Sequence, residues 1–126
     1  MEDRRRGAEH GARFPVRFND VWWRRDLIAS DPEGRAVARR ARECWEREGV
    51  APADLHARLS EGPDGTRLRN CVKAYLGAAR SRPYGIVFVA DLVEGTIVLR
   101  HLAFGERHPA WGKDSVYAIA DRRLNR

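Results

Sequence analysis

The chain has 126 residues, which is enough for one domain with a single core. Its apolar fraction of 43% is typical of a globular protein, and no apolar run reaches the roughly 18 residues that a membrane span requires. The formal net charge is +6, and Lys73 and Lys113 are the only lysines, so arginine supplies nearly all of the positive charge. Arginine suits phosphate recognition, which favours a nucleic-acid partner, although a genome rich in G and C also produces such an excess.

The N-terminus predicts neither a secretory signal nor a folded element. Residues 1–6 are mostly charged and no apolar stretch follows them, so we expect a cytoplasmic protein. Residues 1–13 form a polar, Gly-containing stretch, which predicts a flexible basic arm. A single domain is then expected over residues 14–126.

The cysteines and histidines indicate no metal or other cofactor. Cys44 falls in a predicted helix and Cys71 in a predicted strand, without a Cys-x-x-Cys pair. We expect two reduced thiols that serve as small apolar residues, with a disulfide as the alternative. The four histidines are scattered and lack ligand spacing.

Two helices are predicted in the N-terminal half, after a short strand at residues 16–18. The first helix covers residues 21–28, with Asn19 or Asp20 as its cap. The second begins at Ser30-Asp31-Pro32-Glu33, where a cap residue precedes a proline at the first helical position, and it ends at Gly49. A third, short helix is possible at residues 53–59.

The C-terminal half predicts three strands and a closing helix. Residues 68–76 alternate between apolar and cationic side chains, whereas residues 84–90 are almost entirely apolar. A third strand follows at residues 96–104, and residues 115–126 have helical periodicity. The expected fold is α+β: an N-terminal helical hairpin packed on one face of a small antiparallel β-meander, a C-terminal helix, and a concave cationic face left over.

The closing third also contains a pattern of short motifs. An apolar strand ends in Gly105-Glu106-Arg107, a polar insert follows, and the chain continues as Ser115-Val116-Tyr117 and Ala120-Asp121-Arg122-Arg123-Leu124. In this order, and after this strand pattern, the sequence resembles the RelE/ParE toxin superfamily of bacterial toxin–antitoxin systems. The resemblance covers Leu68 to the C-terminus; the helical hairpin agrees in type only.

The resemblance implies a RelE-like toxin that an antitoxin protein holds silent. In the RelE branch the implied activity is a metal-independent mRNA endoribonuclease, with the ribosome as a further partner. The ParE branch implies an inhibitor of DNA gyrase that cleaves nothing, and a non-toxic interaction module on the same scaffold is the third possibility. No membrane partner is implied, and the sequence does not indicate the oligomeric state.

Site residues follow from the motif and from the chemistry that RNA cleavage needs. The resemblance assigns the Gly-x-Arg arginine to Arg107, the helix tyrosine to Tyr117 and the first-strand lysine to Lys73, as base or second cation. His108 follows Arg107 in the sequence, and histidine, with an unperturbed pKa of about 6.5 as a residue type, suits a proton donor. RNA-binding side chains are expected at Arg67, Arg69, Tyr75, Arg80, Arg82, Trp111 and Lys113.

Three features depart from the family pattern and favour the alternatives to a nuclease. Tyr75 stands where a second lysine is expected, and Gly85 stands where an arginine often follows the aromatic residue of the central strand. The insert of residues 108–114 between Arg107 and Tyr117 is longer than usual. His101, inside a strand, is expected to be structural.

Overall fold

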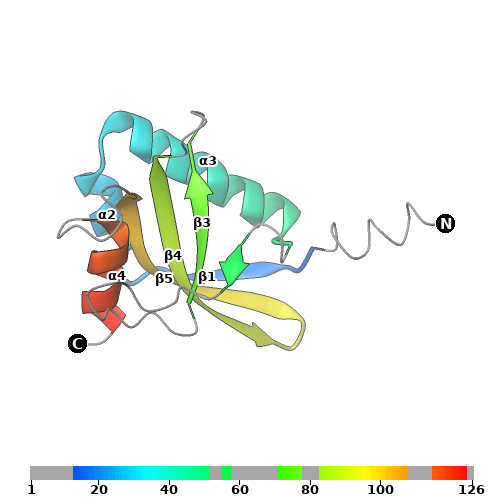
Figure 1. The fold of residues 1–126 in the computed structure, drawn as a ribbon. Helices are drawn as coiled ribbons and strands as arrows, with labels where there is room; N and C mark the ends of the chain where they lie inside the picture. Colours follow the sequence, from blue (N-terminus) through cyan, green and yellow to red (C-terminus); the bar gives the residue numbers. More distant parts are fainter. Residues whose placement is uncertain (1–12, 52–54, 58–70, 78–82, 108–114, 125–126) are drawn as a thin grey trace.

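The computed structural model describes residues 13–51, 55–57, 71–77, 83–107 and 115–124 (Figure 1). Within these ranges the fold is α+β, with three helices and a mixed sheet. The elements are, in chain order, β1 (Val16–Asn19), α2 (Trp23–Ala29), α3 (Pro32–Glu48), β2 (His56–Ala57), β3 (Cys71–Leu76), β4 (Tyr84–Val93), β5 (Thr96–Glu106) and α4 (Val116–Leu124).

The sheet contains the predicted meander but is not purely antiparallel. Its strand order is β1-β5-β4-β3-β2, and β3, β4 and β5 pair antiparallel as expected. The first strand departs from the prediction because β1 pairs parallel with β5, from Val16 opposite Ile97 to Asn19 opposite Arg100. Parallel neighbours need a long crossover connection, and α2 and α3 lie in the chain between these two strands.

The third predicted helix, at residues 53–59, is wrong where the structure describes it. His56 and Ala57 form the short strand β2, which pairs with Lys73 and Val72 of β3. The backbone hydrogen bonds offered by the edge of β3 outweigh a weak local helical pattern, so tertiary pairing decides the conformation here.

Helices cover both faces of the sheet, which corrects the expectation of one bare cationic face. One apolar cluster packs α2 and α3 against Ile86, Phe88 and Leu99. A second cluster, on the opposite face, packs Val116, Tyr117 and Ala120 of α4 on the sheet (Figure 1). Its sheet residues are Cys71, Val87, Leu102 and Ala103.

A β-bulge helps to build this second face. The pairing of β4 with β5 shifts between Val87 and Phe88, since Val87 is opposite Ala103 whereas Phe88 is opposite His101. Leu102 is therefore an extra residue, and it packs with Ala103 in the α4 cluster. The bulge thus adds an apolar residue to the face that α4 covers. The sheet is covered on both sides.

The predicted ends of α3 agree with the structure, whereas the predicted cap of the first helix is wrong: Trp22 precedes α2 without a side-chain capping bond, so neither Asn19 nor Asp20 caps it. The Asp31 side chain accepts a hydrogen bond of 2.7 Å from the backbone N–H of Gly34, and Pro32 opens α3. Gly49, with a φ of 80°, follows the last residue of α3. Ser115 caps α4 by accepting a hydrogen bond from the backbone N–H of Ala118 at 3.2 Å.

Two further sequence expectations concern the cysteines and the membrane. Cys44 and Cys71 are both free thiols, as predicted, and burial raises the pKa of Cys71 to about 11. No helix in the described ranges has the length and apolar character needed to cross a bilayer.

Candidate functional site

Four predicted site residues form one group on the α4 side of the sheet, which we call the cation–aromatic patch: Lys73 and Tyr75 of β3, Arg107 just beyond β5, and Tyr117 of α4. The guanidinium carbon of Arg107 lies 3.8 Å from the centre of the Tyr75 ring. The ammonium of Lys73 lies 5.0 Å from the Tyr75 ring centre and 5.4 Å from that of Tyr117. Two cations and two aromatic rings therefore meet at a single place.

The register of three strands explains how Arg107 reaches the Tyr75 ring. Tyr75 is opposite Gly85, and Gly85 is opposite Gly105, so a tyrosine and two glycines form a row across β3, β4 and β5. The backbone N–H of Arg107 donates to the carbonyl of Pro83 at 2.9 Å, which fixes the start of its side chain beside this row.

Gly85 leaves the space that the Arg107 side chain occupies. A Cβ at this position would lie 3.0 Å from Cγ of Arg107 and 3.2 Å from Cγ1 of Val116. A side chain here would therefore have to displace Arg107 or α4. In the resembled family an arginine often stands at the position of Gly85. In this structure the glycine instead makes room for the side chain of Arg107.

Tyr117 is the most enclosed member of the patch, with 5% of its surface exposed. Burial raises the pKa of its hydroxyl; a hydrogen bond with Arg107 acts in the opposite direction, and Tyr75 adds to the increase. The hydroxyl is accordingly protonated at neutral pH. Such a group can donate a hydrogen bond or a proton, but it cannot act as a base there.

The remaining predicted site residues cannot be placed relative to this patch. Arg107, Lys73, Tyr117 and Tyr75 are brought together, and all four lie within the described ranges. The other predicted residues lie outside the described ranges: His108, Arg67, Arg69, Arg80, Arg82, Trp111 and Lys113.

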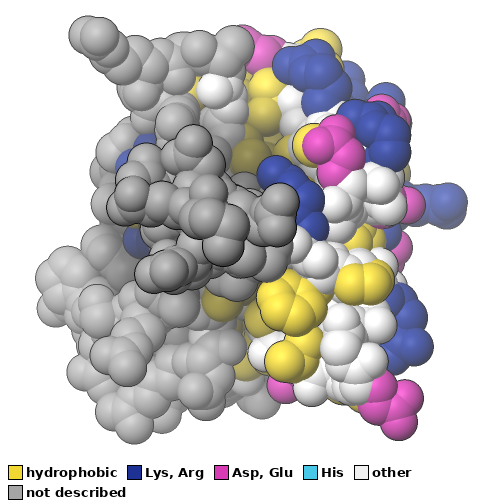
Figure 2. All heavy atoms as spheres, turned by 90° about the vertical axis from the view of Figure 1, so that its right-hand side faces the viewer, with side chains coloured by type: hydrophobic (Ala, Val, Ile, Leu, Met, Phe, Trp, Pro, Cys, Tyr) yellow, Lys and Arg dark blue, Asp and Glu magenta, His cyan; other side chains and the backbone are white. Residues whose placement is uncertain are grey.

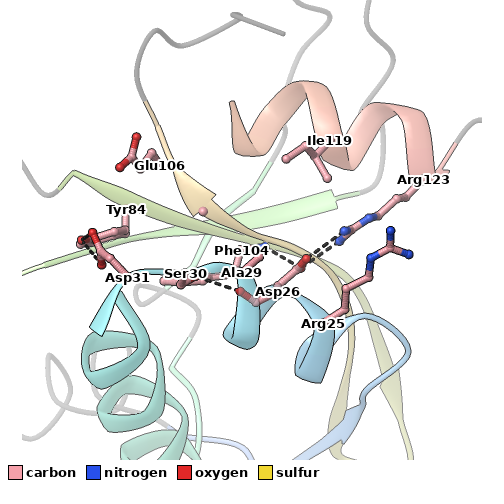
Figure 3. Close-up of a pocket in the computed structure, with 11 residues that line it drawn as sticks. Arg25, Asp26, Ala29, Ser30, Asp31, Tyr84, Phe104, Glu106, Ile119 and Arg123 are labelled. Atoms are coloured by element: carbon pink, nitrogen blue, oxygen red, sulfur yellow. Dashed lines mark hydrogen bonds and ion pairs between the residues drawn. The ribbon is translucent and has the colours of Figure 1, made fainter. Parts of the chain in front are cut away.

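A second polar cluster, which the sequence did not predict, is called the edge network here: Asp26 of α2, His101 of β5 and Arg123 of α4. Figure 3 shows Asp26 and Arg123 of this network. Nη1 and Nη2 of Arg123 each lie 2.8 Å from one oxygen of the Asp26 carboxylate. Nε2 of His101 lies 2.7 Å from Oδ2 of the same carboxylate. An acidic residue three positions after Trp23 and one before Leu27, on the apolar face of the helix, was the available sequence signal.

The edge network satisfies an otherwise open strand edge. β1 pairs with residues 97–100 of β5, so the later part of β5 has no neighbouring strand on that side among the described residues. The backbone N–H of Phe104 donates to Asp26 at 3.0 Å, and Nη1 of Arg123 donates to the carbonyl of Leu102 at 2.9 Å. The buried ions thus cover the edge and join both helices to it.

The Asp26 carboxylate is held in its charged form. Burial acts to raise its pKa, but hydrogen bonds from His101 and Arg123 outweigh burial and lower the pKa below the usual value. His101 is 1% exposed, and its Nδ1 has no hydrogen-bond partner among the described residues. His101 also packs edge-on against Trp23 and Phe88, so its predicted structural role is confirmed.

A groove of about 420 Å³ lies beside the edge network, between α2 and α4 (Figure 3). At one end the Tyr84 hydroxyl donates to Asp31 at 2.9 Å, and burial together with this bond raises the pKa of Tyr84 to about 12. Glu106 lines the same end, whereas Arg25 and Arg123 line the other. The groove therefore has an acidic end and a basic end.

On the outer side of α3, the exposed side chains carry charges of both signs. Arg39 and Arg40 are followed along this helix by Glu43 and Glu46, all exposed. Figure 2 shows Lys and Arg side chains along one rim of the molecule with Asp and Glu side chains between them. Mixed surfaces of this kind are typical of a solvated helix face and carry no local excess of positive charge.

In the described ranges, no group of three His, Cys, Asp or Glu residues could hold a metal ion. No protein-family model matches the chain, and it shows no significant similarity to a curated protein or to a solved structure.

Proposed function

We propose that this chain is a RelE-type toxin that cleaves mRNA without a metal ion. The supporting observation is the meeting of Arg107, Lys73, Tyr75 and Tyr117, predicted as site residues from separate parts of the sequence, in one patch. The order of elements agrees with the expectation as well: a helical hairpin, a three-strand meander and a terminal helix.

The proposed reaction is a transfer within the RNA strand. The 2′-oxygen of one nucleotide attacks the adjacent phosphorus, so a new O–P bond forms while the bond from phosphorus to the 5′-oxygen breaks. A base removes the 2′-hydroxyl proton, an acid protonates the departing 5′-oxygen, and cations stabilise the charge that develops on the phosphate.

The geometry assigns different roles to the members of the patch. Arg107 offers a planar guanidinium for two phosphate oxygens, and its contact with Tyr75 holds that plane in position. Lys73 fits the second cation better than the base, since its ammonium lies 5.0 Å and 5.4 Å from two aromatic ring centres, as in a cation–π contact. Tyr117 keeps its proton and can donate it, and His108 stays the other proton-transfer candidate.

Cleavage by the purified protein tests this function. Arg107→Ala removes the phosphate cation, and the loss expected for one such electrostatic contact is about 100- to 1000-fold in rate. Arg39→Ala, on the outer side of α3, is the matched control and should cleave at the wild-type rate. Mapping of mRNA ends in cells that express each variant gives an independent measurement. Equal cleavage by both variants would disprove the assignment.

One observation favours a ParE-like inhibitor of DNA gyrase as the second candidate. Tyr75 occupies the place of an expected second lysine, so Lys73 and Arg107 are the only cations that the structure shows within the patch. A gyrase inhibitor would arrest growth and damage DNA while transcripts stay intact. That outcome would replace the nuclease proposal.

A further inference from the structure

A cleft lined mainly by arginines lies between α2 and α4 and shares Arg25 and Arg123 with the groove described above. Its volume is about 380 Å³. We call it the α2–α4 cleft, and its lining residues are Trp22, Arg25, Ile119, Arg122 and Arg123. Three of these five residues are arginines, and none is acidic, in contrast to the alternating charges along α3.

We propose that the α2–α4 cleft is a phosphate-binding subsite for the RNA that flanks the scissile bond. This inference rests on the proposed nuclease function, because it places a second contact on the same RNA strand. The charge of Arg123 is matched by Asp26, so Arg25 supplies the cation for the phosphate, which a guanidinium binds through paired hydrogen bonds.

The arginines of this cleft are held in position before any ligand arrives. Arg123 is anchored by its two contacts with Asp26. Its guanidinium carbon also lies 4.3 Å from the centre of the Trp22 ring, and that of Arg25 lies 5.6 Å from the same ring. The Trp22 ring therefore contacts both guanidinium groups and helps to hold them in position.

Arg25 is the residue in this cleft best placed to bind an anion. It is exposed, and it forms no ion pair with any residue that the structure describes. The carboxylate of Asp26 is already matched by Arg123, so it does not neutralise Arg25. A cation held beside a ring in an open cleft is suited to bind a phosphate that comes from solvent.

The two subsites share the helix α4. Tyr117 belongs to the cation–aromatic patch and Arg122 to the α2–α4 cleft, and both lie on α4. A helix rises about 1.5 Å per residue, which separates them by roughly 8 Å along its axis. Asp31 and Glu106 line the neighbouring groove and repel phosphate, so we expect the strand to follow α4 instead.

Arg25→Ala and Arg24→Ala provide a matched pair for the test. Arg24 is the adjacent exposed arginine on α2, but it lines a different pocket, together with Leu27 and Ile28. The probes are two single-stranded RNAs whose 2′-oxygens are methylated to prevent cleavage, one of about twelve nucleotides and one just long enough for the patch. Affinity is measured over a range of salt concentrations, and cleavage of the short unmodified RNA is measured separately.

We expect Arg25→Ala to bind the longer RNA about tenfold more weakly, as the loss of one charge-assisted contact would produce. Its plot of log affinity against log salt should be shallower by about 0.7, the slope for one phosphate contact on a single strand. Binding and cleavage of the short RNA should stay unchanged, and Arg24→Ala should match the wild type throughout.

The possible failures are distinguishable. If the wild type cleaves RNA but Arg25→Ala binds the longer RNA as tightly as Arg24→Ala does, the subsite is disproved and the nuclease function stands. If the wild-type protein neither binds nor cleaves RNA, the proposed function fails, and the subsite fails with it.

Discussion

The edge network and the cation–aromatic patch each place one arginine between β5 and α4, but the partners of the two arginines differ. Arg123 meets a buried carboxylate through two contacts of 2.8 Å and also donates to a backbone carbonyl. Arg107 stacks on an aromatic ring at 3.8 Å and has a second cation, Lys73, beside the same ring. Arg123 is thus paired with a carboxylate, whereas Arg107 contacts two tyrosines and shares the Tyr75 ring with Lys73.

The charged residues of the edge network stabilise the fold, whereas Arg107 and Lys73 of the patch are suited to bind a ligand. A buried carboxylate with three donors satisfies the open edge of β5, and it joins two helices from opposite faces of the sheet. Two adjacent cations make a poor structural pair because they repel each other, and a phosphate between them would remove that repulsion. Substitutions in the edge network should therefore lower the stability of the fold, and substitutions in the cation–aromatic patch should lower the activity.

The largest expected effect is the loss of stability in Asp26→Ala. This substitution leaves Arg123 and the Phe104 N–H without their shared acceptor, and breaking a buried ion pair from one side costs about 3–5 kcal/mol. Urea denaturation measures the change. The control is Asp20→Ala, which removes an exposed partner of Arg42 and should change stability by no more than about 1 kcal/mol. A similar small change in both variants would contradict the structural role of the network.

The next effect sharpens the comparison from the side of the patch. Gly85→Ala places a Cβ 3.0 Å from Cγ of Arg107, so this side chain has to give way, which disturbs the contact of its guanidinium with the Tyr75 ring. Misplacement of a catalytic group by about 1 Å can cost on the order of 100-fold in rate. Steady-state cleavage measures this loss, and thermal denaturation shows whether the fold is retained.

Gly105→Ala is the matched control for Gly85→Ala. Gly105 is the directly paired residue on β5, and nothing lies within 4 Å of the Cβ that it would gain. We therefore expect wild-type cleavage from Gly105→Ala. Equal losses in the two variants would show that the strands, rather than the position of Arg107, govern activity.

The sequence predicted the patch better than it predicted the edge network, and the reason is physical. Arg107, Lys73 and Tyr117 belong to a motif with fixed order, and strand alternation placed Lys73 and Tyr75 on one side of β3. The edge network joins α2, β5 and α4 across more than 70 residues of chain, and no local pattern carries that information.

The same distinction holds for the fold. Helix caps and strand alternation are local, and so α3, β4 and β5 were predicted close to their observed positions. The parallel pairing of β1 with β5 and the burial of the sheet face under α4 depend on how distant elements pack. Apolar residues on both sides of β4 were the available evidence for a sheet covered on two faces, but the prediction did not extend that evidence to α4.

Substitutions of Lys73 are expected to have a smaller effect and to define its role. If Lys73 supplies charge, Lys73→Ala should slow cleavage by about tenfold, whereas Lys73→Arg should keep most of the activity because the cation stays between the rings. If Lys73 is the base, both variants should lose activity equally, because arginine keeps its proton at neutral pH. The ratio of the two rates therefore decides between the alternatives.

The smallest expected effect comes from pH and again separates the two regions. The pKa of Asp26 is lower in the folded chain than its ordinary value, so the unfolded chain binds more protons in acid. The stability that this carboxylate contributes is present above about pH 4, the ordinary aspartate pKa, and is lost as pH falls through the lower folded pKa. Denaturation midpoints measured between neutral and acidic pH should fall less steeply in Asp26→Asn than in the wild type, because the variant lacks this titrating group. Gly85→Ala alters no titrating group, so it should keep the wild-type pH profile of stability; a flattened profile there would show that the patch, and not the edge network, controls the acid sensitivity.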